Sequence, residues 1–169
     1  SRLDAIQAAV LNVKLPRLVS WIERRQIIAS RYIDLLNGLP FFDLPSKPTK
    51  THIVHTWNQF VVRVKNLPSK ETSFKKQLNS SDASLKSISK NQNRRDWLKG
   101  CLQEKGIHTI IYYPKPIHLQ PAYSELGYKE ESFPITEELC NEVLSLPIYP
   151  EISNEEQSYV VNIINQLLN

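Results

Sequence analysis

The stretch HTWNQFVVRV, residues 55–64, carries the clearest strand pattern in the chain. In it Phe60, Val62 and Val64 stand at every second position, which places their side chains on one face of a strand. Valine and phenylalanine are also residues that strands favour. We therefore expect a strand here, with one face turned toward a hydrophobic core.

Helical patterns lie on both sides of this strand. Apolar residues recur at helical spacing over residues 3–36, and Pro16 interrupts the series. Because proline lacks an N–H and disrupts the preceding turn, we expect either one long helix kinked near Pro16 or two helices, ending before Gly38. After the strand, residues 94–105 carry a second helical pattern that closes at Gly106.

Shorter patterns complete the chain. They are a β-rich segment over residues 107–113, a helix over 136–144 with Thr136 at its N-cap, an extended segment over 144–150, and a last helix that begins at a Ser153–Glu156 capping box. The order of helices and strands predicts an α+β (α/β) domain, in which a few-stranded sheet is covered on one face by helices.

Residues 66–92 form a polar tract that is rich in serine, lysine and asparagine and poor in core-forming residues. We expect a flexible insertion here. Two S-x-x-K spacings fall in the tract, Ser73–Lys76 and Ser87–Lys90. A nucleophilic serine or a Schiff-base lysine needs a rigid, desolvated pocket that shifts its pKa, so we expect these side chains to be solvated instead.

Length and composition are ordinary for one soluble globular domain, with 169 residues of which 41% are hydrophobic and 22% charged. The chain has no apolar run of about 18 residues and no signal-peptide pattern, so we expect no membrane partner and a cytoplasmic location. The net charge of +4 could favour an anionic ligand but is weak support for nucleic acid, which we do not expect as a partner.

Two cysteines, Cys101 and Cys140, are too few for a disulfide framework and are expected as buried thiols. Because the chain lacks methionine and begins inside a helical pattern, we expect it to be a segment of a longer protein.

Histidines provide the first candidate for chemistry. His52 and His55 form an H-x-x-H pair, and His108 and His118 lie further on. A zinc site needs three or four ligands that converge. A spacing of three at the start of a strand directs the two side chains to opposite faces, so the sequence does not predict a metal site.

The second candidate is the stretch IIYYPKPIHLQPAY, residues 110–123. Pro114 and Pro116 fix the backbone and remove two hydrogen-bond donors, so the segment keeps its shape without regular strand pairing. A rigid loop at the end of a strand is a common place for binding groups. The side chains that it could offer to a ligand are those of Tyr112, Tyr113, His118 and Gln120. The alternative is a rigid turn whose aromatic rings pack on the core, and the pattern leaves both open.

Taken together, four separated stretches resemble the C-terminal part of the DegT-type (StrS-type) sugar aminotransferases. They are SRLDAIQAAVLNVKLPRLVSWIERRQIIASRY at the N-terminus, TWNQFVVRV in the predicted strand, GIHTIIYYPKPIHLQPAY, and FPITEELCNEVLSLPIYPEISNEEQSYVVNII near the C-terminus. The stretches follow one another in the order that the family has them. Together they cover nearly the whole chain apart from about residues 66–92.

The resemblance implies the small C-terminal domain of a pyridoxal-phosphate aminotransferase of fold type I. Residues 1–38 would form a connecting helix region, and residues 39–169 would form the small domain. Enzymes of this family transfer an amino group, usually from glutamate, to a keto sugar carried on a nucleotide, and they act as homodimers. Their cofactor-binding lysine and large domain lie outside this chain, so the resemblance implies no catalytic residue in it and no activity from it alone.

The resemblance also implies site residues. Arg2 matches an arginine in a turn that approaches the partner subunit's cofactor phosphate, although it could equally make an ion pair at the start of the helix. Tyr113, His118 and Gln120 match the proline-loop motif that helps to bind the nucleotide sugar, with His118 as the first candidate to hydrogen-bond the sugar or the phosphate. Two other functions stay open: a non-catalytic module that binds a sugar nucleotide or a partner protein, and a nucleic-acid-binding domain that uses the mild positive charge.

Overall fold

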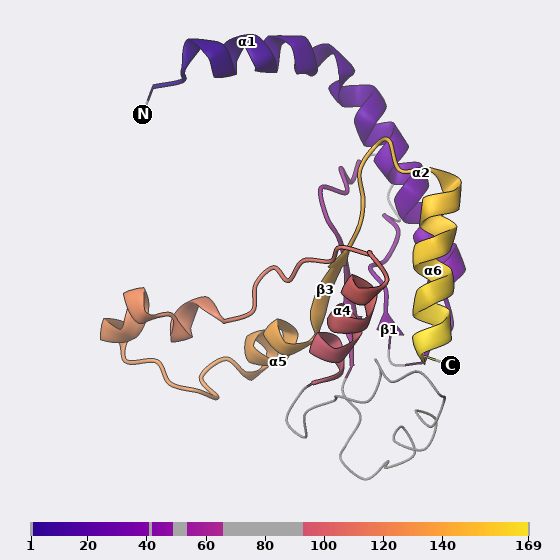
Figure 1. Cartoon of the computed structure of the whole chain (residues 1–169). Helices are drawn as coiled ribbons and strands as arrows, with labels where there is room; N and C mark the ends of the chain where they lie inside the picture. The colour runs from indigo at the N-terminus through magenta and orange to yellow at the C-terminus, as the bar shows by residue number, and fades with distance from the viewer. Residues whose placement is uncertain (1, 41, 49–53, 66–92, 169) are drawn as a thin grey trace.

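One antiparallel sheet with helices around it forms the fold (Figure 1). The strands are β1 (Phe42–Asp43), β2 (Phe60–Val64) and β3 (Val143–Leu146), in the spatial order β1–β2–β3. The computed structural model describes residues 2–40, 42–48, 54–65 and 93–168. His52 and the insertion predicted over residues 66–92, with both S-x-x-K spacings, lie outside the described residues.

A bent helix leads into the domain. It consists of α1 (Ala5–Lys14), a 3-10 turn η1 (Leu15–Arg17) and α2 (Leu18–Leu36). Pro16 lies in the 3-10 turn because it has no N–H to continue the helical hydrogen bonds, and Figure 1 shows the change of direction between α1 and α2. The helix ends before Gly38, whose φ of 84° is a left-handed conformation that glycine adopts without strain. The predicted kink and the predicted stop are both confirmed.

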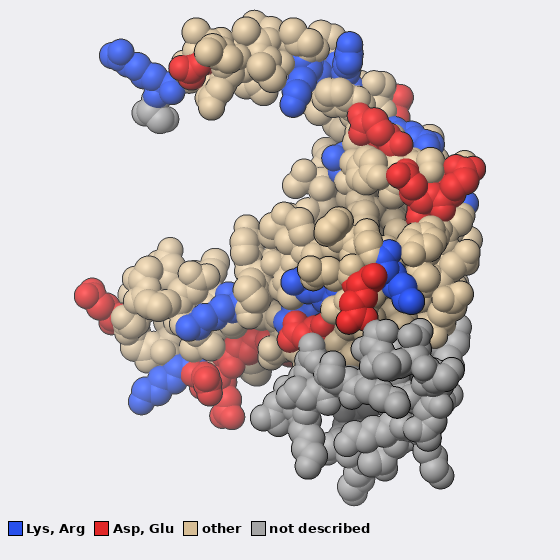
Figure 2. Space-filling model, viewed as in Figure 1, with Lys and Arg blue, Asp and Glu red and all other residues tan. Residues whose placement is uncertain are grey.

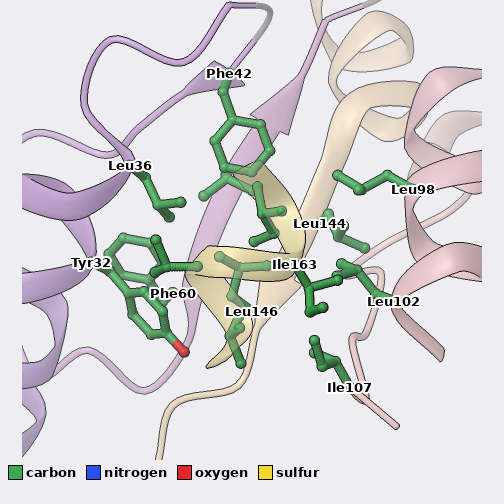
Figure 3. Close-up of a cluster of buried hydrophobic side chains, with 14 of the residues drawn as sticks. Tyr32, Leu36, Phe42, Phe60, Leu98, Leu102, Ile107, Leu144, Leu146 and Ile163 are labelled. Carbon is green, nitrogen blue, oxygen red and sulfur yellow. The ribbon is translucent and has the colours of Figure 1, made fainter. Parts of the chain in front are cut away.

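The buried face of β2 forms the centre of the core (Figure 3). Phe60, Val62 and Val64 are fully buried, as their alternation predicts. Leu146 and Leu144 of β3 continue this face, because the antiparallel register pairs them with Phe60 and Val62. The helices that cover it are α2, α4 (Arg94–Glu104) and α6 (Asn154–Leu168), which contribute buried side chains such as Tyr32, Leu98 and Ile164. The predicted α+β fold, with helices on one face of a small sheet, is confirmed.

Two helix ends form the caps that the sequence predicts. After α4, the Ile107 N–H donates to the Leu102 oxygen at 2.8 Å around Gly106, whose φ is 75°, as in a Schellman motif. Before α6, the Ser153 N–H donates to Glu156 Oε2 at 2.7 Å and the Glu156 N–H donates to Ser153 Oγ at 3.1 Å. These reciprocal bonds are the predicted capping box.

The strand predicted over residues 55–64 is wrong in its first half, because β2 begins only at Phe60. Trp57 has a φ of 48°, which an extended strand does not allow. The His55 side chain stabilises this bend, since its Nδ1 accepts the Trp57 N–H at 3.0 Å and its ring lies 4.1 Å from the Trp57 ring. A local side-chain bond therefore replaces strand pairing here.

The β-rich segment over residues 107–113 is not a regular strand either. A single bridge joins Ile110 to Ser145 of β3, with N···O distances of 3.2 and 2.8 Å. The chain then leaves the sheet ahead of Pro114 and Pro116, which cannot donate to a strand ladder.

The helix predicted over residues 136–144 begins and ends earlier, as α5 (Pro134–Glu142). Thr136 is not its N-cap. Pro134 is the first helical residue, a position where the missing N–H of proline leaves no partner unsatisfied. Val143, inside the predicted helix, is the first residue of β3.

Two smaller expectations are only partly correct. The extended segment predicted over residues 144–150 belongs to a strand only as far as Leu146. Cys101 is a buried thiol as predicted, whereas Cys140 is only partly buried.

Two arginines hold the C-terminal end of α5. Arg63 of β2 donates two hydrogen bonds to Glu142 Oε2, at 2.6 and 3.0 Å, and only 6% of the Glu142 side chain is exposed. Arg95 of α4 is buried and donates to the main-chain oxygens of Cys140 and Val143 at 3.0 and 3.1 Å. These bonds fix α5 against the sheet and α4.

Candidate functional site

The candidate site is a loop that leaves the sheet after Ile110 and ends at the start of α5. We call residues 111–132 the proline loop. It contains two 3-10 turns, η3 (Ile117–Leu119) and η4 (Pro121–Leu126). Pro116 precedes η3, Pro121 lies at the start of η4, and Gly127 ends η4 with a φ of 74°. Figure 1 shows the proline loop projecting from the sheet beside α5.

His118 is buried inside the proline loop, with 8% of its side chain exposed. Its ring makes edge-on contacts with Phe133, at 4.8 Å between centroids, and with Tyr128, at 6.4 Å. Its Nε2 lies 3.0 Å from Glu137 Oε1. Nδ1 has no hydrogen-bond partner among the described residues. The role of His118 as a substrate ligand stays a prediction, and Nδ1 is the ring nitrogen that could fill it.

Glu137, near the start of α5, is a residue that sequence reasoning misses. Its carboxylate accepts the Glu131 N–H at 2.9 Å and the Phe133 N–H at 3.2 Å, in addition to its bond with His118. These donors, the Glu131 N–H first, hold the pKa of Glu137 below its usual value. A signal exists in the sequence: Pro134 is typical of the first helical position, and an acidic side chain is favoured in the first turn of a helix, where N–H groups are free.

We expect the proline loop to lose these bonds at acidic pH. Because the pKa of Glu137 is lower in the folded protein than in the unfolded chain, its contribution to stability is present above the ordinary value of about pH 4.3 and is lost as the pH falls through the folded pKa. The amide resonances of Glu131 and Phe133, followed by NMR, should therefore titrate with a midpoint below about pH 4.3. In a Glu137→Gln variant they should not titrate. A wild-type midpoint at or above the ordinary value would contradict this role.

The other predicted residues are more accessible. Tyr113 is 66% exposed, and its ring lies edge-on to that of Tyr112 at 5.8 Å. Gln120 is partly buried, and its amide makes no hydrogen bond within the described parts of the chain. Arg2 is exposed at the N-terminal end of the bent helix, and Figure 1 shows the N-terminus well apart from the proline loop. The structure thus gathers Tyr113, His118 and Gln120 in one loop but does not bring Arg2 to them.

A hollow lies between the bent helix and the proline loop, and Figure 2 shows that mainly uncharged side chains line it. We call this surface the concave face. No side chain of α1 is buried. The two segments that bound the hollow expose Leu3, Ile6, Val10, Leu11, Val13, Leu15, Leu18 and Val19 on the bent helix, and Tyr112, Tyr113, Ile117, Tyr123, Leu126 and Tyr128 on the proline loop. Large exposed apolar surfaces are typical of sites that contact another protein, a membrane or a ligand.

A separate cavity of about 430 Å³ lies between α6, residues 106–108 and residues 147–152. Two of its polar side chains already make hydrogen bonds within the protein. The Tyr159 hydroxyl donates to the Lys105 oxygen at 3.1 Å, and Glu156 belongs to the capping box. The cavity shares no residue with the proline loop, so it does not add to the predicted site.

The described residues contain neither a metal cluster nor a membrane-spanning helix. No three His, Cys, Asp or Glu side chains in this part of the chain are placed to hold a metal ion. Among the helices of the same residues, none has the length and apolar character needed to span a membrane.

Comparison with known sequences points to one family. The sequence profile of the DegT/DnrJ/EryC1/StrS aminotransferase family matches residues 1–87 and 75–165. A "Pleiotropic regulatory protein" of Geobacillus stearothermophilus is 37% identical over 162 residues, which are 95% of this chain and 36% of that protein. The dTDP-3-amino-3,6-dideoxy-alpha-D-galactopyranose transaminase of Aneurinibacillus thermoaerophilus is 37% identical over 166 residues, which are 98% of this chain and 37% of that enzyme.

A solved structure extends the match to three dimensions. The crystal structure of DesV from S. venezuelae, in complex with a ketimine intermediate, has a TM-score of 0.77 and 33% identity, and covers 99% of this chain and 37% of that one. The chain therefore spans a little over a third of the length of the relatives that it matches. With the family profile matching along most of its length, the chain belongs to the DegT/DnrJ/EryC1/StrS aminotransferase family.

Proposed function

We propose that this chain is the small C-terminal domain of a pyridoxal-phosphate-dependent aminotransferase, which moves an amino group from glutamate to a keto sugar carried on a nucleotide. The observation that carries the proposal is the family match along the chain, together with a relative that is named as a transaminase of a dTDP-amino sugar. The likeness to DesV over 99% of this chain supports the same assignment.

The cofactor would be held mainly by parts of the enzyme outside this chain, with Arg2 as one contact from this chain. The Arg2 side chain is exposed and has no hydrogen bond within the described residues, so its N–H donors are available to a phosphate group. Bound pyridoxal phosphate supplies the electron sink that amino transfer needs. Arg2 would bind the phosphate of the cofactor in a neighbouring subunit and so fix the position of the cofactor.

On the substrate side, the proline loop would contact the nucleotide sugar. Tyr113 offers an exposed hydroxyl, Gln120 an amide without a partner in the described residues, and His118 its Nδ1. Hydroxyl, amide and imidazole groups can donate to phosphate oxygens and exchange hydrogen bonds with sugar hydroxyls. Preorganised side chains on a loop that prolines stiffen would hold the substrate without a large cost in ordering the loop.

The large domain of the enzyme and a second subunit would cover the concave face. A helix with no buried side chain, such as α1, needs a partner surface for its apolar residues. A homodimer in which both subunits contribute to each site would also bring Arg2, which lies apart from the proline loop of its own chain, into a catalytic centre. The two free thiols fit a cytoplasmic, reducing environment.

An amino-transfer assay with the complete protein tests the proposal. Loaded with pyridoxal phosphate, it should convert glutamate and a dTDP- or UDP-linked keto sugar into 2-oxoglutarate and the amino sugar in equal amounts, as measured by mass spectrometry. Residues 1–169 alone should transfer nothing. A complete protein that binds the cofactor but aminates none of these sugars would refute the substrate class, and one that does not bind the cofactor would refute the enzyme class.

A further inference from the structure

We infer that Glu137 is a positioning residue, whose carboxylate seats the proline loop on α5 and thereby presents Nδ1 of His118 to the substrate. The inference deepens the proposed function and rests on it, because it assumes that the proline loop meets the nucleotide sugar.

The first observation is how hydrogen bonds attach the proline loop to the rest of the chain. Within the described residues, every hydrogen bond that joins residues 111–132 to the rest of the chain ends on the Glu137 carboxylate. His118 Nε2 lies 3.0 Å from Oε1, and the Glu131 N–H donates to Oε2 at 2.9 Å. The other bonds of the loop are internal, as between the Ser124 hydroxyl and the Pro121 oxygen at 2.9 Å. A single carboxylate therefore makes the polar attachment of the whole loop.

Aromatic packing adds to this attachment and fixes the plane of the imidazole. The rings of His118, Tyr128 and Phe133 contact one another edge-on, and the Tyr128 and Phe133 centroids lie 5.1 Å apart. Edge-on contacts of this kind favour one ring orientation over others. The ring of His118 is thus held between an aromatic pair and a carboxylate.

The chemistry of the bond decides which nitrogen of His118 faces a ligand. An ionised carboxylate only accepts hydrogen bonds, so His118 Nε2 carries a proton when it bonds to Glu137. Nδ1 then remains for the substrate, as an acceptor in the neutral ring and as a donor in the protonated ring. Glu137 thus acts on the substrate indirectly, through His118 and the loop that it holds.

The helix that carries Glu137, α5, is itself held in place. Glu137 lies at one end of α5, and the other end is held by Arg63, through Glu142, and by Arg95. A supporting group must itself be held in place if it is to orient a binding group. The bonds from the sheet and from α4 meet this condition.

The first test needs no catalysis. Nitrogen-15 NMR of the complete protein, with labelled histidine, should show a proton on Nε2 of His118. Glu137→Gln should change the His118 signals, since glutamine turns an amide N–H₂ toward Glu131 or His118. The matched control is Glu130→Gln, which removes the same charge seven residues before Glu137, in the proline loop, at an exposed side chain with no hydrogen bond in the described residues. A His118 that carries its proton on Nδ1 only, or that responds equally to both variants, would overturn the inference.

The second test separates positioning from general stability. Glu137→Gln should raise the KM for the nucleotide sugar about tenfold, with little change in kcat and none in the reaction with glutamate. Glu130→Gln should leave all three unchanged. An unchanged KM in Glu137→Gln, or an equal loss in the reaction with glutamate, would contradict a role in holding the sugar-binding loop.

One substitution of His118 separates the two ring nitrogens. Glutamine places its amide near the Nε2 position and leaves no group near Nδ1, so His118→Gln should keep the Glu131 amide resonance but lose substrate affinity. Adding Glu137→Gln to His118→Gln should raise KM by much less than Glu137→Gln raises it alone, because most of the effect of Glu137 passes through His118. Fully additive losses would show an independent structural role and overturn the inference. If the complete protein transfers no amino group at all, the proposed function fails, while the NMR test still decides the link between Glu137 and His118.

Discussion

Replacing Phe60 with alanine is expected to lower the free energy of unfolding by about 3–5 kcal/mol. Phe60 is fully buried on the middle strand of the sheet, and its ring lies 5.1 Å from that of Tyr32 and 5.7 Å from that of Trp57. The truncation would remove these contacts and leave a cavity among α2, β2 and the bend at Trp57. Urea unfolding of the complete protein, with hydrogen exchange at the β2 amides to identify the transition of this domain, measures the loss.

Val61→Ala is the matched control for this prediction. Val61 is the next residue of β2 and points to the opposite face, where it is only partly buried. Its truncation should cost about 1 kcal/mol. Equal losses from the two variants would mean that the face of Phe60 is not the core of the domain.

Replacing Arg63 with methionine is expected to destabilise the domain by about 3 kcal/mol. The guanidinium makes two short bonds to Glu142, whose side chain is 94% buried, and it lies 3.5 Å from Glu138. Without Arg63, the Glu142 carboxylate would remain in the interior with no cation to compensate its charge. Because 32% of the Arg63 side chain is exposed, the expected loss lies at the lower end of the range for fully buried pairs.

Two further variants show whether the loss comes from the buried carboxylate. Arg63→Met combined with Glu142→Met should recover much of the stability, since it removes both charges and keeps the volume apolar. Lys65→Met is the control on the same strand end, because Lys65 and Asp43 form a 2.6 Å ion pair with 46% of each side chain exposed. Its loss should stay below about 1 kcal/mol. A Lys65 variant as damaging as Arg63→Met, or a double variant no better than the single one, would contradict this account.

The effect of Arg63 should also reach the proline loop. Glu142 ends α5, and Glu137 lies near its start, so a loosened α5 would move the carboxylate that seats His118. Hydrogen exchange at Glu131 and Phe133, whose N–H groups bond to Glu137, reports this movement.

Short-range patterns predicted much of the fold. The alternation of Phe60, Val62 and Val64 marks the buried face of β2, and Pro16 marks the bend between α1 and α2. The Ser153–Glu156 capping box marks the start of α6. Each of these signals depends on contacts within a few residues, which is why a sequence shows them directly.

The boundaries that failed depend on contacts that a periodic pattern does not contain. The strand over residues 55–64 is shortened by the bond between His55 and Trp57, and the segment over residues 107–113 meets β3 at a single bridge. Both segments are rich in β-forming residues, but propensity yields to local bonds and to the path of the chain.

The candidate site, like the fold, was predictable from sequence only in part. The resemblance to the family pointed to Tyr113, His118 and Gln120 as substrate ligands, which stays a prediction, and the stiffness of the loop follows from its prolines. That the His118 ring turns inward, and that Glu137 receives it, is visible only in the structure. The two residues stand 19 positions apart, and no periodicity relates them.

By itself, the sequence determined the order of the elements, the buried face of β2, the caps of α4 and α6, and the family through stretches spread along the chain. Tertiary structure alone decided which nitrogen of His118 is engaged, which carboxylate holds the proline loop, and that the side chains of α1 stay exposed. The physical reason is the distance along the chain over which each interaction acts. Periodicity and capping are set by neighbours along the chain, whereas the partner of a buried polar group is set by which distant segments the packed core brings together.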